Sequence, residues 1–169
     1  MPKTRDQLLD FLCDHGLAYQ LHEHDAVFTV EESKHLRGTI QGGHSKNLFL
    51  KDKKGRLFIV VAEESAEIDL KTIHTVIGAQ GRVSFGKAEL LEEVWGVRPG
   101  SVTPLGAIND TDGRVTVVLD EAMLRHDQLN FHPLVNTATI TISKDHLVAF
   151  LQAVDHDPLV LSVSRSEAQ

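Results

Sequence analysis

The sequence predicts a single α+β domain over residues 1–169, with a mixed, mostly antiparallel sheet surrounded by helices. Three observations support this prediction. The length suits one domain, and 41% hydrophobic with 24% charged residues is an ordinary globular composition. Neither a repeat nor a Pro/Ser-rich linker divides the chain. Segments with strand and helix periodicity are interspersed, and short hairpin connections argue against a purely parallel sheet.

The first third of the chain carries two helix-start signals. Thr4-Arg5-Asp6-Gln7 has the form of a capping box, and Gly16 is placed to end the helix that it opens. Residues 19–24 alternate in polarity, which predicts a strand. Residues 29–32 form a second capping box, and we expect a short helix from there to about residue 36.

The middle of the chain predicts a hairpin and a helix. Residues 47–51 and 57–62 are β-rich and flank the turn residues 52–55. Asp69 can cap a helix that ends near residue 77, where a glycine-rich turn follows.

The second half continues the alternation, with a turn-rich stretch at 97–109. We expect strands at 82–85, 114–119, 137–142 and 159–163, a helix at 87–95 closed by Gly96, and a last helix from the Ser143 cap to about 154.

The charge distribution is uneven. The net charge is −7, which by itself argues against a nucleic-acid partner, since phosphate contacts need clustered Lys and Arg. Between Lys34 and Arg56, however, the sequence contains seven Lys and Arg residues and one acidic residue, Asp52. This stretch therefore carries a charge of +6, and the rest of the chain carries −13. Residues 51–56 also fit a solvated hairpin tip with a charged edge.

Several protein classes are disfavoured by composition. The lone cysteine, Cys13, cannot close an intramolecular disulfide or supply a thiolate-rich zinc site. The N-terminal residues are polar without the apolar core of a secretory signal, and no run approaches the ~18 apolar residues of a membrane span. We therefore expect a cytoplasmic protein with no membrane partner.

Ten histidines raise the question of a metal. His22 and His24 would point the same way from a strand, and such a pair can bind zinc. Spacing places no third ligand, so surface histidines on an edge strand are the simpler interpretation, and we expect no metal site. Residues 42–47 (GGHSKN) lack the order of a Walker loop, and residues 110–113 are better interpreted as a turn than as a calcium loop.

A covalent nucleophile is also not indicated, because the chain has no Gly-x-Ser-x-Gly elbow and Cys13 has no identifiable partner histidine. A hydrolase of this kind would position a water and a labile substrate, with backbone groups holding the developing charge. Residues 100–106 and 131–137 could supply such a site. Both segments could equally be ordinary connections.

Four motifs in order resemble a known family. They are residues 27–32 (VFTVEE), 46–52 (KNLFLKD), 100–106 (GSVTPLG) and 132–137 (HPLVNT). Together they resemble the YbaK/ProRS-associated aminoacyl-tRNA deacylases, and most closely the freestanding deacylases of Ala-tRNA(Pro). The resemblance covers nearly the whole chain and implies a sheet curved towards a barrel with helices around it.

The resemblance implies hydrolysis of the ester that joins a mischarged amino acid to the 3′-terminal adenosine, with no metal or other cofactor. It makes Lys46 the catalytic side chain, lays residues 100–104 against the aminoacyl end and places His132 in the amino-acid pocket. Phe28, Val30 and Leu105 are further candidates for the pocket walls. The full set of expected substrate-binding residues is Phe28, Thr29, Val30, Asn47, Gly100, Pro104, Leu105, Gly106, His132 and Asn136.

The expected partner is the acceptor end of mischarged tRNA(Pro), with prolyl-tRNA synthetase as a further partner and no DNA. A pocket too small for proline would select alanine, because one methylene distinguishes substrates by only about 1–3 kcal/mol. Three alternatives remain open at this point. They are a deacylase for another amino acid such as Cys-tRNA(Pro), a non-catalytic RNA- or protein-binding module of the same fold, and a zinc hydrolase.

Overall fold

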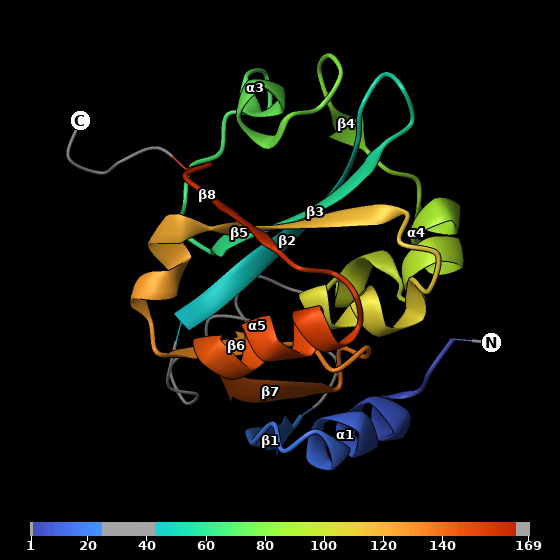
Figure 1. The fold of residues 1–169 in the computed structure, drawn as a ribbon, viewed down its shortest axis with the longest axis vertical. Coiled ribbons are helices and arrows are strands. Elements are labelled where there is room, and N and C mark those ends of the chain that lie inside the picture. The colour runs from blue at the N-terminus through green and yellow to red at the C-terminus, as the bar shows by residue number, and fades with distance from the viewer. Residues whose placement is uncertain (1, 25–42, 165–169) are drawn as a thin grey trace.

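The computed structural model describes residues 2–24 and 43–164, and within them one eight-stranded sheet (Figure 1). The strands are β1 (Tyr19–Glu23), β2 (Gly43–Lys51), β3 (Leu57–Glu63), β4 (Ser84–Phe85), β5 (Val115–Asp120), β6 (Gln128–Phe131), β7 (Ala138–Ser143) and β8 (Leu159–Leu161). The helices are α1 (Arg5–Asp14), α3 (Ile73–Ile77), α4 (Ala88–Trp95) and α5 (Lys144–Ala153), with 3-10 turns η1 (Pro99–Ser101), η2 (Pro104–Asn109) and η3 (Glu121–Arg125).

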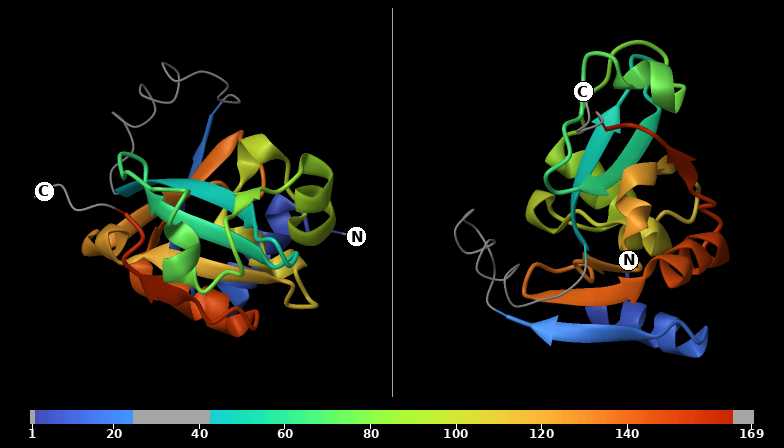
Figure 2. Two further views of the ribbon diagram at one scale, coloured as in Figure 1. Left: turned by 90° about the horizontal axis from the view of Figure 1, so that it is seen from above. Right: turned by 90° about the vertical axis from the view of Figure 1, so that its left-hand side faces the viewer.

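The strand order is β1-β7-β6-β2-β3-β5-β8, and β4 pairs with β2. Four of the strand pairings are antiparallel. The other three are parallel, namely β2 with β6, β3 with β5 and β5 with β8. The predicted mixed, mostly antiparallel sheet is therefore confirmed. The sheet does not close into a barrel, because β1 and β8 remain its edges. In the right-hand view of Figure 2 the β2–β3 hairpin lies in the upper half and β7 with β1 in the lower half.

Alternation along the strands divides the core into two clusters. The larger contains Phe49, Ile59 and Val117 from the sheet, packed with buried residues of α1, α4, η2 and α5. The smaller lies on the other side of β2, β3 and β5, where Leu50, Phe58, Val60 and Val118 pack against Ile73 and Ile77 of α3. The two faces of β2 consequently meet different surroundings.

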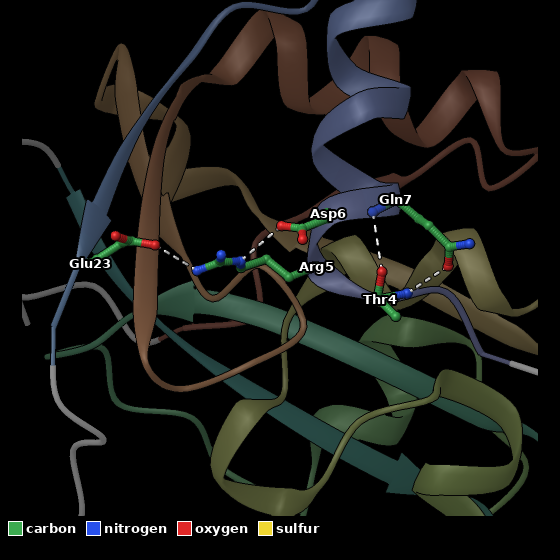
Figure 3. Close-up of polar contacts among 5 residues, drawn as sticks. All are labelled: Thr4, Arg5, Asp6, Gln7 and Glu23. Atoms are coloured by element: carbon green, nitrogen blue, oxygen red, sulfur yellow. Dashed lines mark hydrogen bonds and ion pairs between the residues drawn. The ribbon is translucent and has the colours of Figure 1, made fainter.

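The first helix forms as the sequence predicts (Figure 3). The Thr4 hydroxyl accepts from the Gln7 backbone N–H at 3.3 Å, and the Gln7 side chain accepts from the Thr4 N–H at 2.9 Å. Arg5 reaches Glu23 at 2.9 Å and so ties α1 to the edge strand β1. Gly16 adopts a left-handed φ of 68° just after the helix, as expected for a helix stop.

Three elements differ from the prediction. β2 begins at Gly43, four residues early, because Gly43 and His44 pair with the strand β6. That strand is missing from the prediction, since its four residues carry no β-branched side chain. The helix expected from Asp69 is confined to α3, because the Asp69 carboxylate caps only a turn by accepting from the Lys71 N–H. The helix expected at 29–36 lies outside the described residues.

Candidate functional site

Polar side chains occupy the face of β1, β7 and β6 that is turned away from the larger core. Thr141 donates to the Asn130 side chain at 2.5 Å, and the His22 ring donates to Thr141 at 3.2 Å. Asn130 in turn donates to the Gly43 carbonyl at 3.2 Å. The neighbours of these residues along each strand, such as Ile140 and Leu129, are buried in the larger core. We call this surface of β1, β7, β6 and the start of β2 the polar face.

Lys46 belongs to the polar face by register. His44 pairs with Asn130 in the parallel β2–β6 ladder, and alternation puts Lys46 on the same side of β2. The half-buried Lys46 ammonium donates to the Ala66 carbonyl, beyond the end of β3. Lys46 therefore lies within β2, whereas the sequence predicts it at the start of a strand. Its ammonium group is held by a carbonyl just beyond the end of β3.

Asn47 points to the opposite side of β2, the side on which Phe49 enters the larger core. Its side-chain oxygen is buried and accepts no hydrogen bond from the residues that the structure describes. The two adjacent residues of the motif thus serve different faces of the sheet.

His132 follows β6 and lies on the side of Asn130 by alternation. Its Nδ1 lies 3.1 Å from the Ala138 carbonyl, which can only accept, so Nδ1 carries the proton. Burial and the nearby His24 lower the pKa of His132, although the bond to the Ala138 carbonyl offsets part of this effect. A neutral imidazole with Nε2 as an acceptor results.

The two predicted loops come together at one point. A Cβ added to Gly100 would stand 3.7 Å from the Asn136 amide, which is ordinary contact, and it would meet no other described residue within 4 Å. Gly100 is exposed and its φ is not positive. Neither packing nor backbone conformation within the described residues therefore requires a glycine at position 100. Between His132 and Asn136, buried Leu134 takes a left-handed φ of 70°, which sets the sharp turn of the second loop.

Gly106, in contrast, is explained by packing. A Cβ at this position would lie 2.1 Å from the Trp95 ring. The Trp95 indole donates to the Thr103 carbonyl at 2.6 Å, and the Thr103 hydroxyl accepts from the Leu105 N–H at 3.3 Å. Pro104 and Leu105 are both buried, with Leu105 in the larger core. The second half of the 100–106 loop is thus anchored firmly on α4.

A buried ion pair closes the end of η2. His156 Nε2 lies 2.8 Å from the Asp110 carboxylate, and both side chains are less than 5% exposed. The other ring nitrogen lies 2.7 Å from the Val154 carbonyl, so both nitrogens face acceptors and the ring is protonated. Burial would lower the pKa of His156, but Asp110 more than offsets this and raises it. The ring also stands edge-on to Trp95 at 5.8 Å.

Lysines and arginines gather around the β2–β3 hairpin, as the sequence indicates. The Asp52 carboxylate in this turn is 3% exposed and accepts from the backbone N–H groups of Lys54, Arg56 and Gln80. Burial alone would raise the pKa of Asp52, but these bonds lower it. The Asp52 carboxylate thus stabilises the turn and is shielded from solvent.

A second segment joins this hairpin. Lys51 pairs with Ser84 of β4, and the Lys53 side chain lies against Gly81. Next to Ser84, Phe85 is 60% exposed. We call the exposed cations Lys51, Lys53, Lys54, Arg56 and Arg82, together with Phe85, the basic hairpin.

The remaining predicted site residues, Phe28, Thr29 and Val30, lie outside the described residues. Asn130 and Thr141 are polar residues of the site that the sequence prediction does not include. Predicting them from the sequence would require recognising β6 as a strand. Only the pairing of β6 with β7 shows on which face of the sheet Asn130 lies.

The two histidines in and just after β1, His22 and His24, are hydrogen-bonded to hydroxyls. His22 bonds to Thr141 and His24 to Thr139, at 3.2 and 2.9 Å. Within residues 2–24 and 43–164, no group of three or more His, Cys, Asp or Glu side chains could hold a metal ion. None of the helices described there is long and apolar enough to cross a membrane.

Comparisons with known proteins agree on one family. A family model for the aminoacyl-tRNA editing domain matches residues 24–150. The prolyl-tRNA synthetase associated domain-containing protein 1 of Danio rerio is 37% identical over 160 residues, which cover 94% of this chain and 86% of the relative. The prolyl-tRNA editing protein ProX of Acetoanaerobium sticklandii is 36% identical over 136 residues, 80% of this chain and 82% of the relative.

Solved structures share the fold. The crystal structure of a candidate trans-editing enzyme for prolyl-tRNA synthetase superimposes with a TM-score of 0.73 at 18% identity, over 98% of this chain and all of that one.

Proposed function

This chain belongs to the aminoacyl-tRNA editing domain family and is a deacylase of mischarged tRNA, and we propose that its substrate is Ala-tRNA(Pro). The relatives named for prolyl-tRNA editing and for the prolyl-tRNA synthetase associated domain support tRNA(Pro) as the tRNA. The observation that carries the proposal is Lys46, a cation held on a polar sheet face within the motif of these deacylases.

Lys46 would bind the phosphate of the terminal nucleotide. An ammonium group has three donors, and the Ala66 carbonyl uses one of them in the described structure. The others remain for a phosphate oxygen. Fixing this phosphate would hold the ester against the protein in a reactive geometry, so we expect Lys46 to affect turnover more than folding.

The start of the 100–106 loop would stabilise the oxyanion. Within this loop the Ser101 N–H already donates to Arg98, and the N–H groups of Leu105 and Gly106 are used by Thr103. The Gly100 N–H has no acceptor in the described part of the chain, and Gly100 is exposed. When a water attacks the ester carbonyl, the Gly100 N–H would therefore be able to donate a hydrogen bond to the oxyanion that forms.

His132 would line the amino-acid pocket. Its neutral ring offers Nε2 as an acceptor for the attacking water, and its Nδ1–H bond to Ala138 fixes the orientation of the ring. Selection of alanine would follow from the small size of this pocket, with Phe28 and Val30 as further walls. Leu105, also expected in the wall, is fully buried in the larger core on the other side of the sheet.

The basic hairpin would receive the RNA backbone next to the acceptor end. Its cations come from two segments of the chain. The only acidic residue of the turn, Asp52, accepts hydrogen bonds from backbone N–H groups. Exposed Phe85 adds a surface on which a base can stack. Phosphate contacts of this kind predict salt-sensitive binding despite the net charge of −7. Prolyl-tRNA synthetase would be a further partner, and the site of action would be the cytoplasm.

A deacylation panel tests the substrate. Purified protein is incubated with Ala-, Cys-, Ser- and Pro-tRNA(Pro), with and without a metal chelator. We expect rapid hydrolysis of Ala-tRNA(Pro), little hydrolysis of Pro-tRNA(Pro), and no effect of the chelator. Preferred cleavage of Cys-tRNA(Pro) would change the assigned amino acid, equal cleavage of all four would refute size selection, and loss of activity with the chelator would favour a metal hydrolase.

A further inference from the structure

A buried carboxylate without a full set of partners lies at the end of β5. Asp120 is 0% exposed, and one of its oxygens accepts from the Val163 N–H at 3.2 Å. The other oxygen is buried and makes no hydrogen bond within the described residues. Burying a carboxylate without compensation is costly, so a free oxygen of this kind indicates a place for a donor, above all a cation.

The sheet register points to the donor. Lys46 pairs directly with Ala62 across the β2–β3 ladder. In the parallel β3–β5 ladder Val61 pairs with Leu119, so one further step brings Asp120 beside Ala62. Val60 and Val118, two residues earlier on β3 and β5, share the smaller core, so Ala62 and Asp120 project from that same face, as does Lys46 with Leu48 and Leu50.

The three residues thus form a row across three strands, with alanine in the middle. Neighbouring strands lie about 4.8 Å apart, so the Cα atoms of Lys46 and Asp120 are about 10 Å apart. An extended lysine spans most of this distance, and the Asp120 side chain spans the rest. Ala62 is the smallest residue in the run from Leu57, so β3 contributes only a methyl group between the two charges.

We propose that Asp120 is a positioning residue for Lys46, whose ammonium it holds through its free carboxylate oxygen when the aminoacyl end is bound. The ammonium would then have two acceptors on the protein, the Ala66 carbonyl and Asp120, and its third donor would be aimed at the substrate phosphate. This inference rests on the proposed deacylase function and adds to it a residue that no motif indicates.

The experiment is a double-mutant cycle on single-turnover hydrolysis of Ala-tRNA(Pro). Asp120→Asn keeps an oxygen for the Val163 N–H and removes the charge. We expect it to lower the maximal rate about tenfold with little change in KM, because a misplaced ammonium affects the bound ester more than tRNA binding. In the Lys46→Ala background the same change should slow hydrolysis less than twofold. An unchanged rate for Asp120→Asn, or an equal loss in both backgrounds, would overturn the proposal.

A second pair of variants tests the path between the charges. Ala62→Val places bulk between Lys46 and Asp120, whereas Val118→Ile adds bulk to the same buried face two residues before Asp120. We expect Ala62→Val to lower the rate about as much as Asp120→Asn does, and Val118→Ile to leave it within twofold at equal thermal stability. Equal rates for both variants would contradict the proposed path.

A measurement without turnover separates the two claims. The ¹³Cε resonance of Lys46 is recorded with a saturating, uncharged tRNA(Pro) acceptor minihelix. A shift caused by Asp120→Asn supports the pairing even if Ala-tRNA(Pro) proves to be the wrong substrate, and an unshifted resonance refutes it even if deacylation is confirmed.

Discussion

Replacing His156 by leucine should destabilise the protein strongly, because it removes one member of a buried ion pair. The His156 and Asp110 side chains are 4% and 2% exposed, so solvent screens their interaction little. Breaking such a pair costs about 3–5 kcal/mol, since the remaining charge stays buried. The Arg114 and Val115 N–H groups would still donate to Asp110, at 3.0 and 2.9 Å, and this favours the lower end, about 3 kcal/mol.

The loss converts into a change in melting temperature. One kcal/mol lowers Tm by about 2–4 °C in a chain of this size, so His156→Leu should melt about 6–12 °C below the wild type at pH 6. Adding Asp110→Asn should restore part of the difference, because no charge then remains buried. Differential scanning calorimetry measures all three proteins. A drop under 2 °C for His156→Leu would refute the reasoning.

The pH dependence of the same pair has a defined sign. Asp110 raises the pKa of His156 above its ordinary 6.5, so the stabilisation is complete below pH 6.5 and is lost as the pH rises through the folded-state pKa. Although burial acts to raise the pKa of Asp110, His156 and the backbone N–H groups lower it, so its contribution is present above pH 3.8 and is lost as the pH falls through the folded value. Wild-type Tm should therefore fall on the alkaline side more steeply than that of His156→Leu. Parallel curves would contradict the pairing.

Three further changes test other parts of the structure. Gly106→Ala places a Cβ against Trp95, and we expect a loss of about 1–3 kcal/mol in urea unfolding. Gly100→Ala meets only Asn136 at 3.7 Å, so its stability should match the wild type while deacylation slows at least tenfold, and an unchanged rate would remove Gly100 from the site. Asp155 has a left-handed φ of 61° after α5, so Asp155→Gly should raise the unfolding free energy by about 0.5 kcal/mol, whereas a loss would indicate that the carboxylate itself is needed.

Local signals in the sequence were sufficient for most of the fold. The Thr4 capping box, the stop at Gly96 and the Ser143 cap are complete within a few residues, and all three helix ends form as predicted. β6 depends on long-range pairing, since its short sequence acquires strand character from β7 and the start of β2. The early start of β2 at Gly43 has the same cause. Pairing between strands that are distant in the sequence produces no periodic pattern of apolar residues within the short strand itself.

The site divides in the same way. The resemblance of the motifs to the deacylase family singles out Lys46, Gly100, His132 and Asn136, and the structure brings Gly100 next to Asn136. The roles of all the expected site residues stay predictions, and Phe28, Thr29 and Val30 lie outside the described residues. Spacing alone does not distinguish the two glycines of the 100–106 loop, and only the position of the Trp95 ring explains Gly106 by packing.

The measurement that tests the central claim most directly compares wild type with Lys46→Ala on Ala-tRNA(Pro), at single turnover and with the tRNA affinity determined alongside. A cation that fixes the terminal phosphate predicts a rate at least a hundredfold lower for Lys46→Ala, at near-equal Tm and with a modest change in tRNA binding. Hydrolysis by Lys46→Ala at the wild-type rate, or loss of tRNA binding in proportion to the rate, would contradict the account.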